Sequence, residues 1–319
     1  MRTALLAVTV LAGCGDWFSE PPPPPLPEDA YLVWAQVPDG YQTQWRSAAG
    51  EVLSTHPGLT VAWDNQLWSL SSSVVSRPVL DCGCLMALDG AFDAEKPAAS
   101  CVSEGTASRQ VLTSGSRSIE LVSGAPSDPW VSDQEQHLTP HGGAGPYLVF
   151  SVAESGYPCG AAHGYHHVGL EVIDLRAAGS VGLDALVSEA SLRSSDPALF
   201  SAAREALRAD GGSDTMIEPE APLTLTAVWL QWGAAGLRAD AQLTADACYA
   251  CSDGGWSGYT RSHRFALPTL PAPLGAHAAL PAALADAVPA DPAQVWGFSR
   301  LRALPDELTA LRGSLPSGD

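Results

Sequence analysis

Three histidines lie close together in the stretch Tyr157-Pro158-Cys159-Gly160-Ala161-Ala162-His163-Gly164-Tyr165-His166-His167. Neutral imidazole is a common ligand of zinc and copper in proteins. His163, His166 and His167 are therefore candidate metal ligands, and His137 and His141 are further candidates. A second interpretation stays open and is preferred: His163 packs in a glycine-rich turn with its ring bonded to backbone carbonyls, and the other two lie at a strand edge.

Cysteine pairs offer two further chemistries. Cys248-Tyr249-Ala250-Cys251 has the spacing of a thioredoxin-type redox pair, but acidic and glycine residues surround it, and redox chemistry favours a first cysteine at a helix N-terminus, where its pKa falls. Cys82 and Cys84 together with this pair would make a four-thiolate zinc site. We favour disulfides over both alternatives.

A cysteine near the amino terminus has a different context. The apolar stretch 4–12 follows Met1-Arg2 and has the length of a secretory signal rather than of a membrane span. Leu11-Ala12-Gly13-Cys14 resembles the lipobox of bacterial lipoproteins. This resemblance implies cleavage before Cys14, diacylglycerol on its sulfur and an acyl chain such as palmitate on its new amino group. Two or three acyl chains anchor a protein firmly to a bilayer, so we expect a cell-envelope lipoprotein on the periplasmic or outer-surface side of a bacterial membrane.

The number of cysteines agrees with export. The chain has seven cysteines, and lipidation of one leaves an even number in a compartment that oxidises thiols. The disulfide candidates are Cys82, Cys84, Cys101, Cys159, Cys248 and Cys251. Neighbouring Cys82 and Cys84 should bond to different partners, and Cys101 is near enough in sequence to take one of them, closing a loop worth about 3 kcal/mol.

The segment 14–30 is expected to be a linker. It contains five consecutive prolines, Pro21 to Pro25, which fix φ and donate no backbone N–H. Such a run forms polyproline II at about 3.1 Å per residue. We expect a stiff stalk that holds the folded part away from the lipid.

Charge and absent motifs limit the function. The formal net charge is −19, which repels phosphate backbones and excludes nucleic acid as a favoured partner. A protein ligand should be basic, with an association rate that falls as ionic strength rises. The sequence contains no GxSxG, HExxH, P-loop or strand-linked GxGxxG motif, and no paired carboxylates stand out as acid and base. An enzyme is therefore less favoured than a binding protein.

The elements that would position these residues are mostly strands. Alternating apolar residues predict strands over 31–37, 59–63, 66–70, 147–153, 168–175, 223–232, 237–244 and 261–267. Glycine and proline predict a loop over 128–145. Ser195-Asp196-Pro197 is typical of a helix start, and a helix should continue to Gly211-Gly212 with Leu199, Phe200, Ala203 and Leu207 on one face. A short helix is also expected at 305–313.

This order predicts an α+β fold, mainly antiparallel sheet with one principal helix packed on it and disulfides as staples. Ten tryptophans are expected to fill the β-rich core rather than to stack on sugars. The expected organisation is a signal peptide over 1–13, the anchored linker over 14–30, a β-rich cysteine-containing region over 31–145 and an α+β domain over 146–319.

The second half of the chain resembles a known extracytoplasmic domain. The features are Gly160, Ala162, His163 and Gly164 between two strands, then Asp174-Leu175, Leu183-Asp184-Ala185-Leu186, the helix at 196–208 and the strands that follow. Over about 147–285 this order is similar to the RsiV-like domain of lysozyme-sensing anti-sigma factors and some polysaccharide deacetylases, with Ala161 where a second glycine is expected. The resemblance implies an envelope domain that binds a protein or accompanies glycan enzymes.

We therefore expect a membrane-anchored, non-enzymatic module that binds a basic protein or a cell-wall glycan. The alternative is an envelope protein that binds zinc or copper through His163, His166 and His167. Apart from this alternative, no cofactor is expected.

Overall fold

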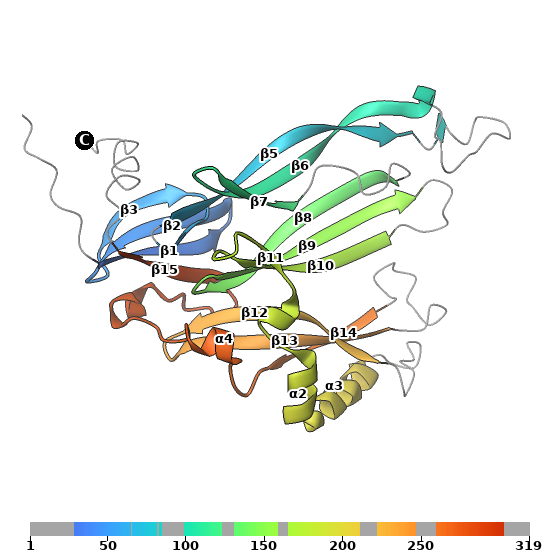
Figure 1. Ribbon diagram of the computed structural model, residues 1–319. Helices are drawn as coiled ribbons and strands as arrows, with labels where there is room; N and C mark the ends of the chain where they lie inside the picture. The colour runs from blue at the N-terminus through green and yellow to red at the C-terminus, as the bar shows by residue number, and fades with distance from the viewer. Residues whose placement is uncertain are drawn as a thin grey trace, which may run out of the picture.

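The computed structural model describes residues 29–64, 66–81, 83–84, 99–122, 131–158, 165–210, 222–246 and 260–302. Within these residues the chain folds into antiparallel β-sheets with a few short helices (Figure 1). The expected predominance of antiparallel sheet is confirmed.

Sheet A joins the first described strands to the last one. Its order is β15-β1-β2-β3. Its strands are β1 (Asp29–Val37), β2 (Gly40–Ser47), β3 (Val52–Pro57) and β15 (Trp296–Arg302). The predicted strand over 31–37 is confirmed as part of β1, whereas the pairing of β1 with β15 was not anticipated.

Three further sheets are built largely from hairpins. Sheet B has the order β4-β5-β6-β7, sheet C the order β11-β10-β9-β8 and sheet D the order β12-β13-β14. The strands of sheet B are β4 (Thr60–Trp63), β5 (Gln66–Leu80), β6 (Val102–Ser114) and β7 (Arg117–Val122). Those of sheet C are β8 (Val131–Ala144), β9 (Tyr147–Pro158), β10 (Tyr165–Asp174) and β11 (Gly179–Val181). Those of sheet D are β12 (Leu223–Gly233), β13 (Gly236–Asp246) and β14 (Thr260–Ala266).

Sheet C lies between sheets B and D (Figure 1). Successive side chains of a strand point to opposite faces, and β9 uses this alternation to serve two cores. Val149 packs in a core shared with sheet D and the helices. Leu148 and Phe150 pack in a second core with sheet B residues such as Trp68. A strand buried on both faces explains why 147–153 is almost continuously apolar.

Two helices pack against sheet D. The helix α2 (Glu189–Ser195) is capped by Ser188 and precedes α3 (Pro197–Asp210). The Asp196 Oδ1 atom accepts a hydrogen bond of 3.2 Å from the Leu199 backbone N–H, as the predicted helix start requires. Phe200, Ala203 and Leu207 are buried in the core with sheet D, so the predicted apolar face of this helix is confirmed.

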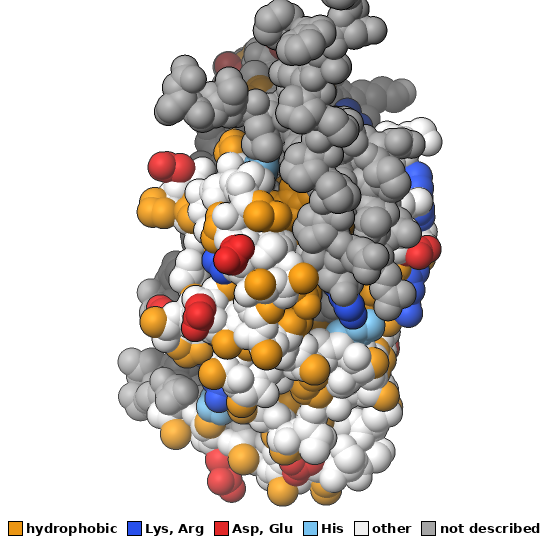
Figure 2. Space-filling model, turned by 90° about the vertical axis from the view of Figure 1, so that its left-hand side faces the viewer, with side chains coloured by type: hydrophobic (Ala, Val, Ile, Leu, Met, Phe, Trp, Pro, Cys, Tyr) orange, Lys and Arg blue, Asp and Glu red, His pale blue; other side chains and the backbone are white. Residues whose placement is uncertain are grey.

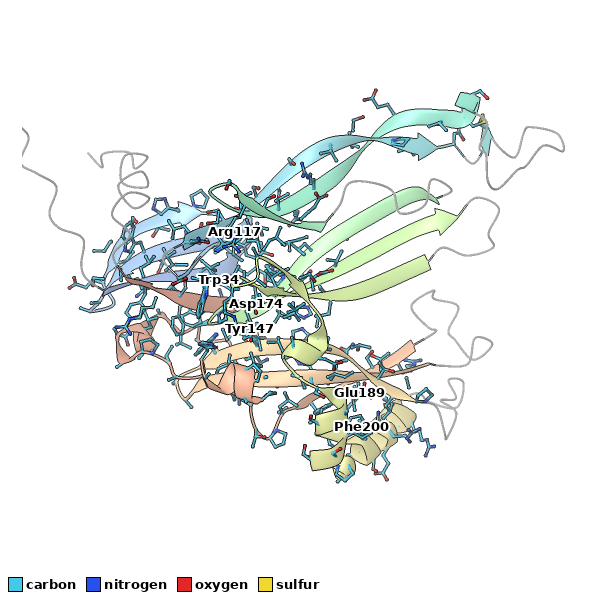
Figure 3. The ribbon with its side chains drawn as sticks, in the orientation of Figure 1. Trp34, Arg117, Tyr147, Asp174, Glu189 and Phe200 are labelled. Carbon is cyan, nitrogen blue, oxygen red and sulfur yellow. A yellow bond between two sulfur atoms is a disulfide. The ribbon has the colours of Figure 1, made fainter. Side chains whose placement is uncertain are left out.

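Two side chains of α2 satisfy an exposed strand edge. Glu189 Oε2 accepts from the Leu225 backbone N–H at 2.8 Å, and an Arg193 Nη atom donates to the Leu223 carbonyl at 2.9 Å. Both backbone groups belong to β12, the edge strand of sheet D. Glu189 and Phe200 are labelled beside this edge in Figure 3. Covering an edge in this way prevents its pairing with another chain.

The predicted loop over 128–145 was wrong for residues 131–144, which form β8. The proline and glycines that suggested a loop are accommodated by a bulge between Pro140 and Gly142. Gly142 has φ +124°, and a Cβ there would lie 2.6 Å from the Leu230 carbonyl oxygen, so glycine allows sheet C to approach sheet D closely.

The boundary expected between the β-rich region and the α+β domain lies between residues 145 and 146. It falls in the turn of the β8–β9 hairpin, whose strands pair from Ala144 and Tyr147 onward. Val33 packs in the same core as Val149 and Val228, so the regions 31–145 and 146–302 share their interior. The described residues of the two predicted regions therefore fold together. The helix expected at 305–313 lies outside the described residues.

One disulfide occurs among the described residues. Cys84 is bonded to Cys101 over a sequence separation of 17 residues, with 5.4 Å between the two Cα atoms. This is one of the two pairings that the spacing allows for Cys101. It closes the far end of the long β5–β6 hairpin (Figure 3).

Most of the described tryptophans fill the core, as expected. Trp34, Trp45, Trp68 and Trp232 are at most 5% exposed. Trp34 lies at the meeting point of sheets A, B and C (Figure 3). A Cβ at Gly297 would be 2.7 Å from the Trp34 Cε2 and Cζ2 atoms, and one at Gly143 would be 3.2 Å from Cζ2. A side chain at position 297 of β15 would therefore collide with the indole, and one at position 143 of β8 would crowd it.

We expect Gly297→Ala to lower the free energy of unfolding by about 1–3 kcal/mol, because the added methyl overpacks the Trp34 site. Urea denaturation of the oxidised chain measures this change. The matched control is Gly233→Ala, since a Cβ at Gly233 meets no atom within 4 Å. Equal effects of the two substitutions would contradict the tight contact.

Candidate functional site

The histidine cluster is only partly within the described residues. His163 lies outside them, and His166 and His167 belong to β10, where their backbone positions pair with Ser155 and Glu154 of β9. The strand assignment agrees with the interpretation that His166 and His167 are strand residues. Zinc or copper binding by His163, His166 and His167 stays a prediction.

His137 and His141 both lie on β8. His137 precedes the bulge, and His141 lies within it, between Pro140 and Gly142. His137 is exposed, whereas His141 is 8% exposed and stacks on Trp229 with ring centroids 4.8 Å apart. The Arg264 guanidinium lies 4.5 Å from the Trp229 ring centroid and pairs with Asp240 at 2.9 Å. In the described part of the chain, no group of three His, Cys, Asp or Glu side chains is arranged to hold a metal ion.

Burial lowers the pKa of His141 to about 4; the Val228 backbone opposes this shift and the charge of Arg264 adds to it. Its Nδ1 atom is buried without a hydrogen-bond partner. At neutral pH the ring is therefore uncharged and serves as a stacking surface within the sheet C–sheet D contact.

The cysteines predicted to form other disulfides, Cys82, Cys159, Cys248 and Cys251, lie outside the described residues, as does the lipidation candidate Cys14. The redox and zinc-thiolate alternatives for Cys248 and Cys251 are therefore neither supported nor excluded by the structure.

The Asp174-Leu175 step fixes the end of β10. Asp174 Oδ1 accepts from the Arg176 backbone N–H at 3.0 Å and from its Nε at 2.9 Å, and a second Arg176 nitrogen donates to the Tyr147 hydroxyl at 2.6 Å. These hydrogen bonds and the Arg176 charge lower the pKa of Asp174, although burial opposes them. Figure 3 shows Asp174 and Tyr147 close together at the centre of the molecule. The arrangement closes a turn and has the geometry of a structural ion pair.

A polar pocket of about 200 Å³ lies against sheet A. Its floor is one face of three neighbouring strands, because Ala35 pairs with Trp296 of β15 on one side and with Gln42 of β2 on the other. Two residues further along, Val33 pairs with Gln44. The lining residues are Val33, Ala35, Gln42, Gln44, Arg46, Asp286, Ala287, Pro289, Gln294 and Trp296. We name this site the sheet A pocket.

The wall of the sheet A pocket is the segment before β15, which begins with the 3-10 helix η5 (Ala282–Ala287). Leu284 of this helix is fully buried in the core. Gly50 has φ +87°, and a Cβ there would collide with the Ala283 carbonyl, so glycine lets the β2–β3 turn touch η5. The Gln36 backbone N–H donates to the Val295 carbonyl at 3.0 Å, and Gln294 Nε2 donates to the Gln36 carbonyl at 3.1 Å. The wall is thus held at η5 by the buried Leu284 and the contact with Gly50, and near β15 by the hydrogen bonds with Gln36.

The polar groups of the pocket are partly committed to one another. Arg46 donates to Gln44 Oε1 from Nε at 3.1 Å and from an Nη atom at 2.6 Å, and to the Gly50 carbonyl at 2.9 Å. Burial lowers the pKa of Arg46, and the charge of Asp286 partly restores it. Gln42 makes no side-chain hydrogen bond to another described residue. Among the described residues, the site therefore presents one uncommitted carboxamide, that of Gln42, beside the oppositely charged side chains of Arg46 and Asp286.

Trp296 gives the pocket a rigid apolar side. It is 3% exposed, and its ring lies 5.7 Å from that of Phe298 and 6.0 Å from that of Trp232, which itself donates from Nε1 to the Gly143 carbonyl at 3.0 Å. These contacts fix the indole between sheets A, C and D. The pocket is therefore formed before any ligand arrives.

Sequence reasoning did not identify this pocket. The alternation of Gln42, Gln44 and Arg46 with Thr43 and Trp45 indicates one polar face of a strand, and that signal was available. Nothing in the local sequence links this face to residues 286–296, since the two segments are joined only by the pairing of β1 with β15.

No protein-family model, curated protein or solved structure matches the chain. In addition, none of the helices within the described residues has the length and apolar character needed to cross a membrane. The function must be argued from the amino-terminal motif and the sheet A pocket.

We expect stability to fall as pH drops from about 6.5 to 4, in part through His141. Its pKa is about 4 in the folded chain and 6.5 when unperturbed, so over this range the unfolded chain binds a proton that the folded chain does not. The contribution reaches about 3 kcal/mol at low pH. His141→Phe keeps a ring on Trp229 but cannot titrate.

Denaturation of both forms at pH 4 and pH 7 measures the difference, because carboxylate titration is common to both. The variant should lose less stability on acidification than the parent chain. The same loss in both would show that His141 does not contribute.

Proposed function

We propose that this chain is a membrane-anchored envelope lipoprotein whose folded part is a non-enzymatic binding module. The observation that carries the proposal is Leu11-Ala12-Gly13-Cys14 at the end of an apolar leader. An acylated Cys14 would hold the protein on a bilayer, and the proline run after it would separate the folded part from the lipid.

The folded residues support an extracytoplasmic location. The Cys84–Cys101 disulfide is the kind of bond that persists in oxidising compartments and is rare in the cytosol. It joins the tip of a hairpin that has little core of its own, where a covalent staple contributes most. The other cysteines, Cys82, Cys159, Cys248 and Cys251, would pair in the same compartment.

The element order after residue 147 supports the proposed resemblance to the RsiV-like domain. Strands β9 and β10 are followed by the Asp174 turn, the 3-10 helix η2 (Leu183–Ala185), helices α2 and α3 and the strands of sheet D. Such a domain would bind a ligand outside the cytoplasm rather than catalyse a reaction. A pocket that holds the uncommitted carboxamide of Gln42 suits this role.

A cell-wall glycan is the ligand that we favour over a basic protein. The overall charge of −19 suits a cationic protein. Yet on the face that Figure 2 shows, acidic and basic side chains are interspersed with apolar and uncharged polar surface, and the acidic groups in view do not form one patch. A surface of this kind suits a neutral ligand better than one captured by charge.

We expect native material to carry a cleaved and acylated amino terminus. Intact-mass and peptide mass spectrometry of protein from a bacterial host should find Cys14 as the first residue, with diacylglycerol on sulfur. Cys14→Ser should remove the lipid and move the protein from the membrane fraction to the soluble fraction.

Cys84→Ser combined with Cys101→Ser is the matched control, because it also removes thiols but should keep the lipid. An unmodified Met1 in native protein, or a membrane fraction unchanged by Cys14→Ser, would overturn the anchored-lipoprotein proposal.

A further inference from the structure

We propose that the sheet A pocket binds a single neutral pyranose ring of a glycan. This inference rests on the proposed function, because it names the class of ligand that the binding module would take. The binding itself can be measured whether or not the protein is anchored to a membrane. It is carried by the side chains that the β15-β1-β2 pairing and the η5 wall bring together.

The pocket offers paired donors and acceptors that suit sugar hydroxyls. Each hydroxyl both donates and accepts, so adjacent hydroxyls are best met by planar groups that do the same. The Gln42 carboxamide is uncommitted among described residues. Gln44 uses its Oε1 atom for Arg46 and retains its Nε2 donors, while Asp286 supplies acceptors. These three side chains line one small space.

The remaining lining suits the C–H faces of a sugar ring. The apolar lining residues are Trp296, Val33, Ala35, Ala287 and Pro289. Trp296 and Val33 are only 3% and 4% exposed, so Ala35, Ala287 and Pro289 supply most of the apolar surface that a ligand can reach. The indole behind them is held by its contacts with Trp232 and Phe298. Trp296 makes no side-chain hydrogen bond within the described part of the chain. An apolar surface beside polar side chains suits a molecule that is apolar on one side and polar on the other.

Charge and size select a small neutral ligand. Arg46 and Asp286 have opposite charges and line the same pocket. Three of the five Arg46 N–H groups already donate to Gln44 and Gly50. Arg46 is therefore poorly placed to form the paired hydrogen bonds by which arginine binds a carboxylate or a phosphate. The volume of about 200 Å³ is below the roughly 300–1,000 Å³ of sites for drug-sized molecules. One ring, at a chain end or a branch, would occupy it.

The wall makes binding possible without a large rearrangement. Leu284 anchors η5 in the core, and the Gln36–Val295 hydrogen bond fixes the segment where β15 begins. A ligand therefore meets ordered groups and loses less free energy to their ordering. The pocket opens at Asp286 and Gln294, which are exposed.

The test uses the full chain with Cys14→Ser and oxidised cysteines, so that its outcome does not depend on lipidation. The probes are glucose, galactose, mannose and N-acetylglucosamine, added singly to protein labelled with ¹⁵N at the indole nitrogens. Loss of one signal in Trp296→Phe assigns the Trp296 indole. We expect at least one sugar to shift this signal in a saturable way, independently of salt concentration.

Gln42→Ala and Asp286→Asn should each weaken that affinity by about tenfold, because each removes a partner of a buried hydroxyl. The matched control is Gln110→Ala, a glutamine on β6 in sheet B, which should leave the affinity unchanged. Unfolding curves of each variant confirm that the fold is intact.

The proposal is overturned if no sugar shifts the Trp296 signal, or if the affinity is the same in Gln42→Ala and Asp286→Asn as in the control. Salt-dependent binding of a cationic protein such as lysozyme, with the Trp296 signal unmoved, would also overturn it and favour a protein ligand. None of these results bears on Cys14, so failure of the sugar site and failure of the lipid anchor are distinguishable.

Discussion

Burial of the Trp34 indole is the constraint on which the rest of the structure depends. The side chain is 1% exposed, and it lies against Gly297 of β15, where a Cβ would collide with it, and close to Gly143 of β8. This contact requires the first and last described strands to lie side by side and brings sheet C against both. The same pairing places Trp296 beside Ala35 and Gln42, so the packing that closes the fold also builds the floor of the sheet A pocket.

Local patterns predicted the elements well where one physical signal dominated. The alternation of apolar and polar residues from Leu237 to Leu243 predicted the strand β13. Asp196-Pro197 predicted the start of α3, because a capping side chain and a proline act within one helical turn. The neighbouring strands predicted over 59–63 and 66–70 pair as β4 and β5, and the bond of Cys101 to a nearby cysteine is likewise short-range. In each case the partners are close in sequence.

The features that were missed depend on contacts between distant segments. Residues 131–144 read as a loop because Pro140 and Gly142 break strands in isolation, but here Gly142 is needed for the close approach of Leu230 and the bulge accommodates the proline. Val33 and Val228 lie on either side of the expected 145/146 boundary and share one core, and no local pattern indicates this contact. The sheet A pocket could not be predicted for the same reason, because no local sequence pattern connects Gln42 with Asp286.

The central structural claim is that Trp34 joins the two ends of the folded chain and thereby assembles the pocket. Nuclear Overhauser measurements on the folded, isotope-labelled protein test it most directly. The account predicts strong cross-peaks from the Trp34 ring protons to the α-protons of Gly297 and weaker ones to those of Gly143. Well-resolved spectra in which the Trp34 ring shows contacts to neither glycine would contradict it.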